Sequence, residues 1–135
     1  MDEQERSALG MRIRRRVLGD EHVDRAEATK NEIDAEFQDL ITRYAWGEIW
    51  IRPALPRHTR SLLTIGLMVA LNRGEELRLH LRSAANNGVT AEEIREVLLH
   101  CAIYCGVPAA NAAFRAAKEI LNQRHAPEQG SDGTL

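Results

Sequence analysis

Apolar residues recur at helical spacing along most of the chain, and no segment shows the alternation with a period of two that indicates a strand. Phe37, Leu40, Ile41 and Tyr44 follow the helical spacing. Residues 57–72 are apolar on nearly every side, so we expect the central buried helix there. The pattern predicts an all-α, single-domain helical bundle of about six helices.

Turn residues divide this pattern into helices. Gly19 is expected to end the first helix, and residues 20–35 are polar and give the weakest helical signal, as an arm lying on a neighbour would. Gly47 is a plausible stop for the helix that follows, and residues 47–56 are expected to form a short helical turn and then a loop. Pro53 and Pro56 then require a loop, because proline breaks longer elements.

The later boundaries carry stronger signals. Gly88 follows two asparagines and is a plausible helix stop. Thr90 with Glu93 three residues later forms a capping-box sequence, which predicts a helix start. Gly106 is expected to end that helix, and Pro108 fits the first turn of the last one.

Length and composition allow one domain. We expect residues 1–125 to form it and the polar residues 126–135 to be a disordered tail. Hydrophobic residues make up 44% and the net charge is −2, which is ordinary for a soluble chain and gives no bias toward polyanions. No segment is apolar enough for a membrane span and no signal peptide is visible, so a cytoplasmic protein is expected.

The sequence offers one candidate for proton chemistry, in residues 73–88. Arg73, Glu76, His80 and Ser83 form a polar line on one helical face, beside an apolar line that would pack inward. A carboxylate one turn from an imidazole could be a partly buried proton-transfer site. It could equally be an ordinary charged helix surface.

Other residues could complete such a site. Arg60, at the start of the apolar helix, and Arg52 are cations that could enter a cavity, or they could pair with surface acids. Trp46 and Trp50 are either the wall of a pocket or the largest core residues. The basic run at residues 14–16 is expected to be a solvated or subunit-facing turn.

Several other functions are disfavoured. The five histidines are scattered; two could meet in space, but no pair has the spacing of a helical zinc site, and no metal site is expected. Cys101 and Cys105 lie four apart on one helix, which favours a structural role over redox chemistry. Residues 76–98 weakly resemble a helix-turn-helix, but three glutamates on its second helix are the wrong charge for DNA.

Three segments resemble the gamma-carboxymuconolactone decarboxylase family, over about residues 10–121. They are RRRVLGDEHVDRA, YAWGEIWIRPAL, and the long run from RSLLTIGLMVALN through RGEELRLHLRSAANNG to EEIREVLLHCAIYCGVPAANAAF. The resemblance implies an alkylhydroperoxidase D-like fold and a ring-like homohexamer built as a trimer of dimers. It also implies loss of carbon dioxide from gamma-carboxymuconolactone to give beta-ketoadipate enol-lactone, in the protocatechuate branch of aromatic catabolism.

The chain departs from the peroxidase branch of that superfamily. Those proteins carry C-x-x-C followed after three residues by His, and here the two cysteine positions fall on Arg73 and Glu76 while His80 remains. Disulfide cycling at that position is therefore not available. Two alternatives stay open: a thiol peroxidase using Cys101 or Cys105, and a non-catalytic oligomeric scaffold of the same fold.

The implied reaction needs no cofactor, because the lactone can accept the electrons left by the departing carboxylate. His80 is expected to be the general acid, with Glu76 orienting it and raising its imidazolium share near neutral pH. The predicted partner is a small dicarboxylate lactone. Its predicted binding residues are Arg60, and less firmly Arg52 and Arg73, with Trp46 and Trp50 excluding water.

Overall fold

The computed structural model describes residues 1–125, and every regular element in that range is helical. The all-α prediction is therefore confirmed, with seven α-helices in place of about six. The predicted tail lies outside the described residues. The elements are α1 (Glu3–Leu18), α2 (Asp20–Thr29), α3 (Ala35–Ile41), the π-helix η1 (Thr42–Ile49), α4 (Arg57–Ala70), α5 (Gly74–Ser83), the 3-10 helix η2 (Ala84–Asn87), α6 (Ala91–Tyr104) and α7 (Val107–His125).

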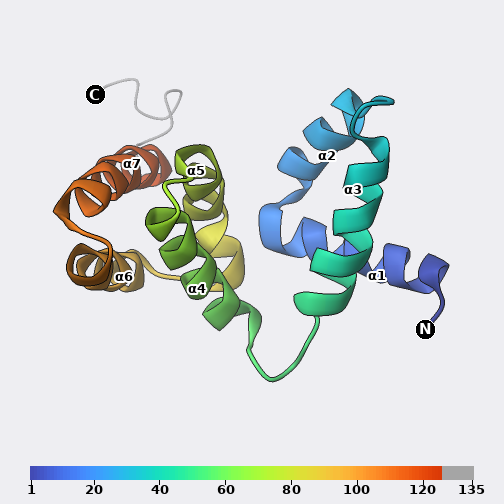
Figure 1. Cartoon of the computed structure of the whole chain (residues 1–135), viewed down its shortest axis with the longest axis horizontal. Helices are drawn as coiled ribbons and strands as arrows, with labels where there is room; N and C mark the ends of the chain where they lie inside the picture. The colour runs from blue at the N-terminus through green and yellow to red at the C-terminus, as the bar shows by residue number, and fades with distance from the viewer. Residues whose placement is uncertain (126–135) are drawn as a thin grey trace.

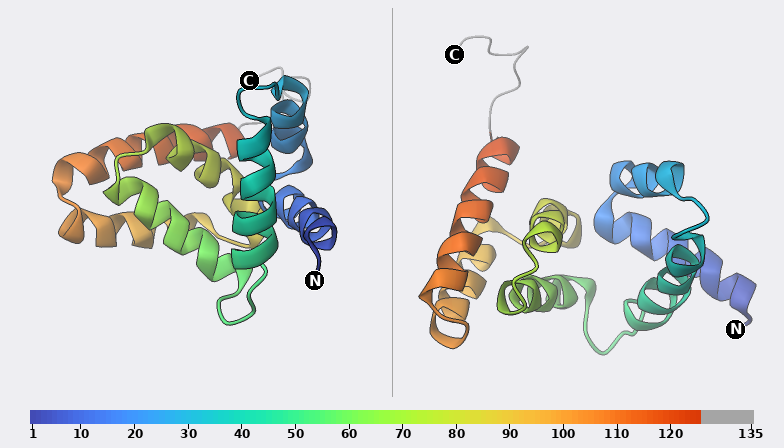
Figure 2. Two further views of the ribbon diagram at one scale, coloured as in Figure 1. Left: turned by 45° about the vertical axis from the view of Figure 1, so that its right-hand side comes forward. Right: turned by 45° about the horizontal axis from the view of Figure 1, so that its top comes forward.

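The helices form two groups, which Figures 1 and 2 show side by side. The N-terminal group contains α1, α2, α3 and η1, and the C-terminal group contains α4 to α7. A loop over residues 50–56, which holds both predicted loop prolines, leads from one group to the other. In both figures α5 lies on the side of its group that faces the N-terminal helices.

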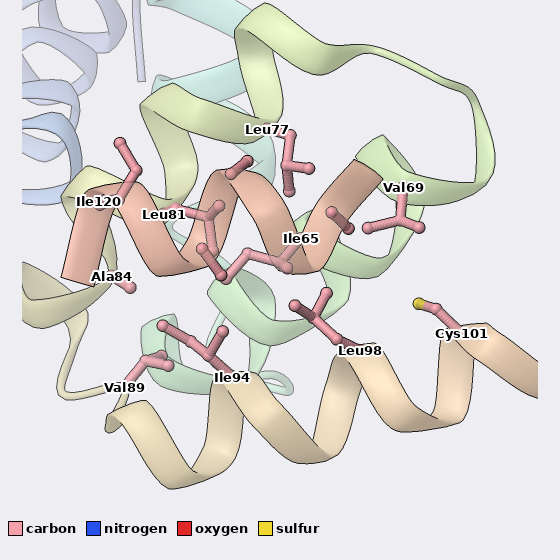
Figure 3. Close-up of a cluster of buried hydrophobic side chains, with 13 residues drawn as sticks. Ile65, Val69, Leu77, Leu81, Ala84, Val89, Ile94, Leu98, Cys101 and Ile120 are labelled. Atoms are coloured by element: carbon pink, nitrogen blue, oxygen red, sulfur yellow. The ribbon is translucent and has the colours of Figure 1, made fainter. Parts of the chain in front are cut away.

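The larger core lies inside the C-terminal group. Ile65 of α4, Leu81 of α5, and Ile94 and Leu98 of α6 are almost fully buried there (Figure 3). Small residues on α7 let that helix approach the others closely. They are Ala113, Ala116 and Ala117.

α4 contributes to the core, as predicted for the central buried helix, but only one of its faces is buried among the described residues. One face, with Ser61, Ile65 and Val69, is buried. Leu63 and Leu67 on the other face are 52% and 48% exposed. The segment is apolar nearly all round, yet only one face packs against other residues of the range 1–125.

The N-terminal group is held together by close packing of α1 along η1, and two glycines make it possible. A Cβ on Gly10 would stand 1.9 Å from the Thr42 carbonyl oxygen, and one on Gly47 would stand 2.6 Å from the Arg6 carbonyl oxygen. The prediction that Gly47 stops its helix is therefore wrong. Helical structure continues to Ile49, and Gly47 is needed for helix contact rather than for chain reversal.

The basic run on α1 also differs from its prediction. Arg14 is only 3% exposed and donates hydrogen bonds to the Gln38 side chain at 2.8 Å and to the Thr42 hydroxyl at 3.4 Å. Arg15 pairs instead with Asp20 and Asp24 at the surface. Arg14 is thus a structural cation between helices, not a solvated residue.

Polar bonds join the two groups next to α5. The side-chain amides of Asn86 and Asn87 in η2 both donate to the carbonyl oxygen of Val17, at 3.2 and 3.4 Å. Val17 is close to the end of α1, and α2 begins directly after Gly19. These bonds hold the first turn of α2 near the end of α5.

The predicted boundaries around α6 are confirmed. Gly88 is left-handed with φ of 76° and follows η2, and Gly106 separates α6 from α7 with φ of 100°. Thr90 and Glu93 form both bonds of the capping box. Pro108 lies in the first turn of α7.

Candidate active site

His80 lies in the last turn of α5 and is half-buried. Burial, and after it a positive charge on nearby His22, lower the pKa of its imidazole to about 4. Glu76 acts in the opposite direction but is the weakest of these three influences. The imidazole of His80 is therefore neutral near pH 7.

Glu76 favours the charged form of His80, the direction that the sequence predicted, but its effect is smaller than that of burial. Its side chain is exposed, and within the described residues it makes no hydrogen bond to His80. Water screens an exposed carboxylate, so burial determines the pKa of the imidazole. Ser83 is also not part of an exposed polar line, because it is buried and its hydroxyl donates to the Leu79 carbonyl oxygen at 2.8 Å.

His22, from the first turn of α2, is the neighbour that sequence reasoning did not select. Burial lowers its pKa first, and the charges of Arg14, Arg25 and Arg82 lower it further. These arginines come from α1, α2 and α5. The sequence allowed that two histidines might meet, but residues 58 positions apart carry no spacing signal for it.

Two of the three predicted carboxylate-binding arginines have partners within the protein, and the third is exposed. Arg60 donates to the backbone carbonyl oxygens of Leu55 and Arg52, at 3.1 and 3.2 Å, and so fixes the loop before α4. Arg52 pairs with Glu48 at 3.4 Å. Arg73 is exposed at the opposite end of α5 from His80, roughly 10 Å away along the helix axis.

The tryptophans lie between the N-terminal group and α5. Their ring centroids are 5.1 Å apart, and Trp46 is 7% exposed whereas Trp50 is half-buried. Both pack in a cluster with Val17 and Val23, and Leu79 of α5 contacts the same cluster. Leu79 precedes His80, so these rings help to fix the helix that carries the imidazole.

The cysteines are poorly suited to thiol chemistry. Cys101 is buried, and burial together with neighbouring Cys105 raises its pKa to about 11. A thiol peroxidase needs the thiolate, which is scarce here near neutral pH. This weighs against the peroxidase alternative.

A second imidazole–carboxylate pair lies away from His80. Nε2 of His58 is 2.9 Å from both carboxylate oxygens of Glu93, and hydrogen bonds from His58 and Thr90 lower the pKa of Glu93. Because Glu93 is already the capping residue of α6, the pair ties α4 to the start of that helix. Nothing in the sequence predicted that His58 and Glu93 are in contact.

Residues 1–125 contain neither a candidate metal site nor a candidate membrane span. No group of three or more His, Cys, Asp or Glu side chains in that range could hold a metal ion. Among the described helices, none combines the length and apolar character that crossing a bilayer would require.

The fold and the site together define a small all-α protein with a half-buried, neutral imidazole at a junction of helices. The model of the carboxymuconolactone decarboxylase family matches residues 35–119. A 4-carboxymuconolactone decarboxylase from Acinetobacter baylyi is 50% identical over 121 residues, which is 90% of each chain. A nitrosuccinic acid decarboxylase from Metarhizium robertsii is 45% identical over 84% of this chain and 79% of its own.

A Pseudomonas putida protein, also named 4-carboxymuconolactone decarboxylase, is 52% identical over 48 residues, its whole length and 36% of this chain. The chain belongs to the carboxymuconolactone decarboxylase family, with its alkylhydroperoxidase D-like all-α fold.

Proposed function

We propose that this protein is a carboxy-lyase that converts 4-carboxymuconolactone into beta-ketoadipate enol-lactone in protocatechuate catabolism. The observation that carries the proposal is 50% identity to a decarboxylase of that name over 90% of both chains. The half-buried imidazole of His80 supports it, because the reaction must deliver a proton to carbon.

The chemistry requires an electron sink and a proton donor. When the bond to the departing carboxylate breaks, its electron pair moves through the ring double bond into the lactone carbonyl. Carbon dioxide leaves, and a proton must then reach carbon. The lactone supplies the sink, so the protein has to bind a dianion, stabilise the dienolate and supply the proton.

His80 is the proposed proton donor in this reaction. An imidazole can exchange a proton near neutral pH, and the partly buried position protects the dienolate from other proton sources. We keep Glu76 as the residue that helps to orient it. We also keep Arg60, Arg52 and Arg73 as candidate carboxylate ligands, with Trp46 and Trp50 limiting access of water.

We also propose that the protein assembles as a hexamer, a trimer of dimers, in the cytoplasm. The unpaired face of α4 continues onto α6, where Ile103 and Tyr104 are 78% and 77% exposed. A largely apolar groove of about 660 Å³ runs between these helices. Apolar area of this kind favours burial against another copy. The free cysteines suit a reducing compartment.

The test of the reaction is a direct assay with enzymatically generated 4-carboxymuconolactone. We expect wild type to consume it with release of carbon dioxide and to form the enol-lactone. Cys101→Ser should retain wild-type turnover, because the thiol takes no part. Absence of decarboxylation by wild type would contradict the function, and thiol-dependent turnover lost in Cys101→Ser would support the peroxidase alternative.

Nitrosuccinic acid is the second substrate to assay. The relative named for it is 45% identical to this chain. Nitrosuccinate is also a dicarboxylate whose nitro group can accept the electron pair left by carbon dioxide. Faster turnover of nitrosuccinate than of the lactone would reassign the substrate while leaving the reaction type unchanged.

A further inference from the structure

A cavity lies between the start of α5 and α7, and His80 is not among the described residues that line it. Its volume is about 270 Å³, slightly below the roughly 300–1,000 Å³ of pockets that hold drug-sized ligands. The space exists because α7 contributes only small apolar side chains to this wall. They are Ala109, Ala112, Ala113 and Ala116. The cavity therefore has room for a small ligand.

The charged side chains that line this cavity within residues 1–125 are all cations. Arg73 comes from the turn before α5, Arg78 from α5 itself and Arg115 from α7. No Asp or Glu of the described residues contributes to the lining. Like charges around one space repel each other, so the cavity favours a negatively charged occupant.

Two of these arginines are available to a ligand. Arg78 donates to the carboxylate of Glu119 on α7 at 2.9 Å, which offsets part of its charge. Arg73 and Arg115 are exposed, and neither side chain forms a hydrogen bond or ion pair with another residue of the range 1–125. An anion can therefore bind between these two without displacing an acid of the described chain.

The backbone holds Arg73 at the opening of the cavity. Asn72 is left-handed with φ of 58°, and the N–H of Arg73 donates to the Met68 carbonyl oxygen at 2.9 Å, so the turn before α5 is tightly fixed. A Cβ on Gly74 would have nothing within 4 Å, so the backbone beside Arg73 is accessible. Leu77, part of the larger core, closes the inner side (Figure 3).

We propose that this cavity is a binding site for a small oxyanion, a carboxylate or a phosphate, held between Arg73 and Arg115. Guanidinium groups bind both kinds of anion through paired N–H···O bonds. The alanine and leucine walls exclude part of the water and so strengthen the attraction. Arg73 lies roughly 10 Å from His80 along α5, so this site is separate from the imidazole and does not depend on the proposed reaction.

Calorimetry on the full-length protein at low salt tests the site, with inorganic phosphate and succinate as separate probes. At least one probe should bind wild type with a Kd of about 1 mM or tighter, and the tighter of the two identifies the kind of anion. Arg115→Gln should raise that Kd roughly 10-fold or more, because a bond to a charged group is lost, and Arg115→Lys should recover part of the affinity. Arg95→Gln is the matched control. Arg95 is an exposed arginine of α6 that pairs with Glu92 at 3.6 Å, so its replacement should leave the Kd at the wild-type value.

Ala112→Leu separates binding in the cavity from a general effect of charge. Ala112 is exposed and lines the cavity, so leucine fills the space while every charge remains. This variant should raise the Kd at least roughly 10-fold, whereas His80→Gln should bind the probe as wild type does. The proposal is overturned if wild type binds neither probe up to about 10 mM, if Arg115→Gln and Ala112→Leu keep the wild-type Kd, or if His80→Gln abolishes binding.

Discussion

His80 is the residue on which the proposed chemistry depends, and its surroundings keep its imidazole neutral near pH 7 in the free protein. Burial is the largest cause, and a positive charge on His22 acts in the same direction. A neutral imidazole cannot donate a proton to a carbanion-like intermediate efficiently. The substrate must therefore supply the negative charge that makes the donor form, which links binding to catalysis at one residue.

This link predicts a distinctive pH dependence. The pKa of His80 in the free protein is lowered to about 4, so its protonated share falls about tenfold for each pH unit above that value. We expect kcat/KM to decrease as pH rises from 5 to 8, while kcat stays nearly level over part of that range because the bound dianion raises the pKa. Steady-state rates across this range measure both. A kcat/KM that is constant from pH 5 to 8 would contradict the assignment.

At the scale of the elements, the sequence predicted the helices well and their partners poorly. Local signals such as the Thr90–Glu93 capping box and Gly88 were confirmed because they act within a few residues. The structural role of Gly47 could not be predicted because it depends on a contact with another helix. The Arg6 carbonyl oxygen of α1 leaves no room for a Cβ at this position. The nearness of His22 to His80 was hidden for the same reason: contacts between distant segments leave no spacing in the sequence.

The contact between α1 and η1 gives a stability prediction. Gly10→Ala should lower the free energy of unfolding by roughly 2–3 kcal/mol, because the new methyl group would overlap the Thr42 carbonyl oxygen. Gly74→Ala is the matched control, since nothing lies within 4 Å of its Cβ position. It should be neutral or stabilising by up to about 1 kcal/mol. Urea unfolding of both variants measures the difference, and equal stabilities would contradict the close packing described for α1.

At the scale of the whole molecule, a large apolar surface on α4 and α6 is not covered by any other part of the chain that the structure describes. Leu63, Leu67 and Ile103 are among its exposed residues. A separate apolar surface occurs on α3, where Phe37 is 56% exposed. Surfaces of this extent on a short chain favour assembly. The polar junction that holds His22 and His80 is separate from these apolar surfaces.

The assembly prediction concerns the α4–α6 surface. Wild type should elute as a hexamer at micromolar concentration, and Ile103→Glu should shift it to smaller species because a charge cannot be buried there without a partner. Ile103→Leu keeps the apolar character and should remain hexameric. Sizing chromatography with light scattering measures all three. A monomeric wild type, or an Ile103→Glu variant of unchanged size, would contradict the proposed interface.

The most direct test of the central claim compares kcat/KM for 4-carboxymuconolactone in wild type and His80→Gln. Loss of the general acid should lower kcat/KM by about 100-fold or more. Glu75→Gln, an exposed change on the same helix, should leave kcat/KM unchanged. A His80→Gln enzyme that keeps the fold and decarboxylates the lactone at nearly the wild-type rate would contradict the account.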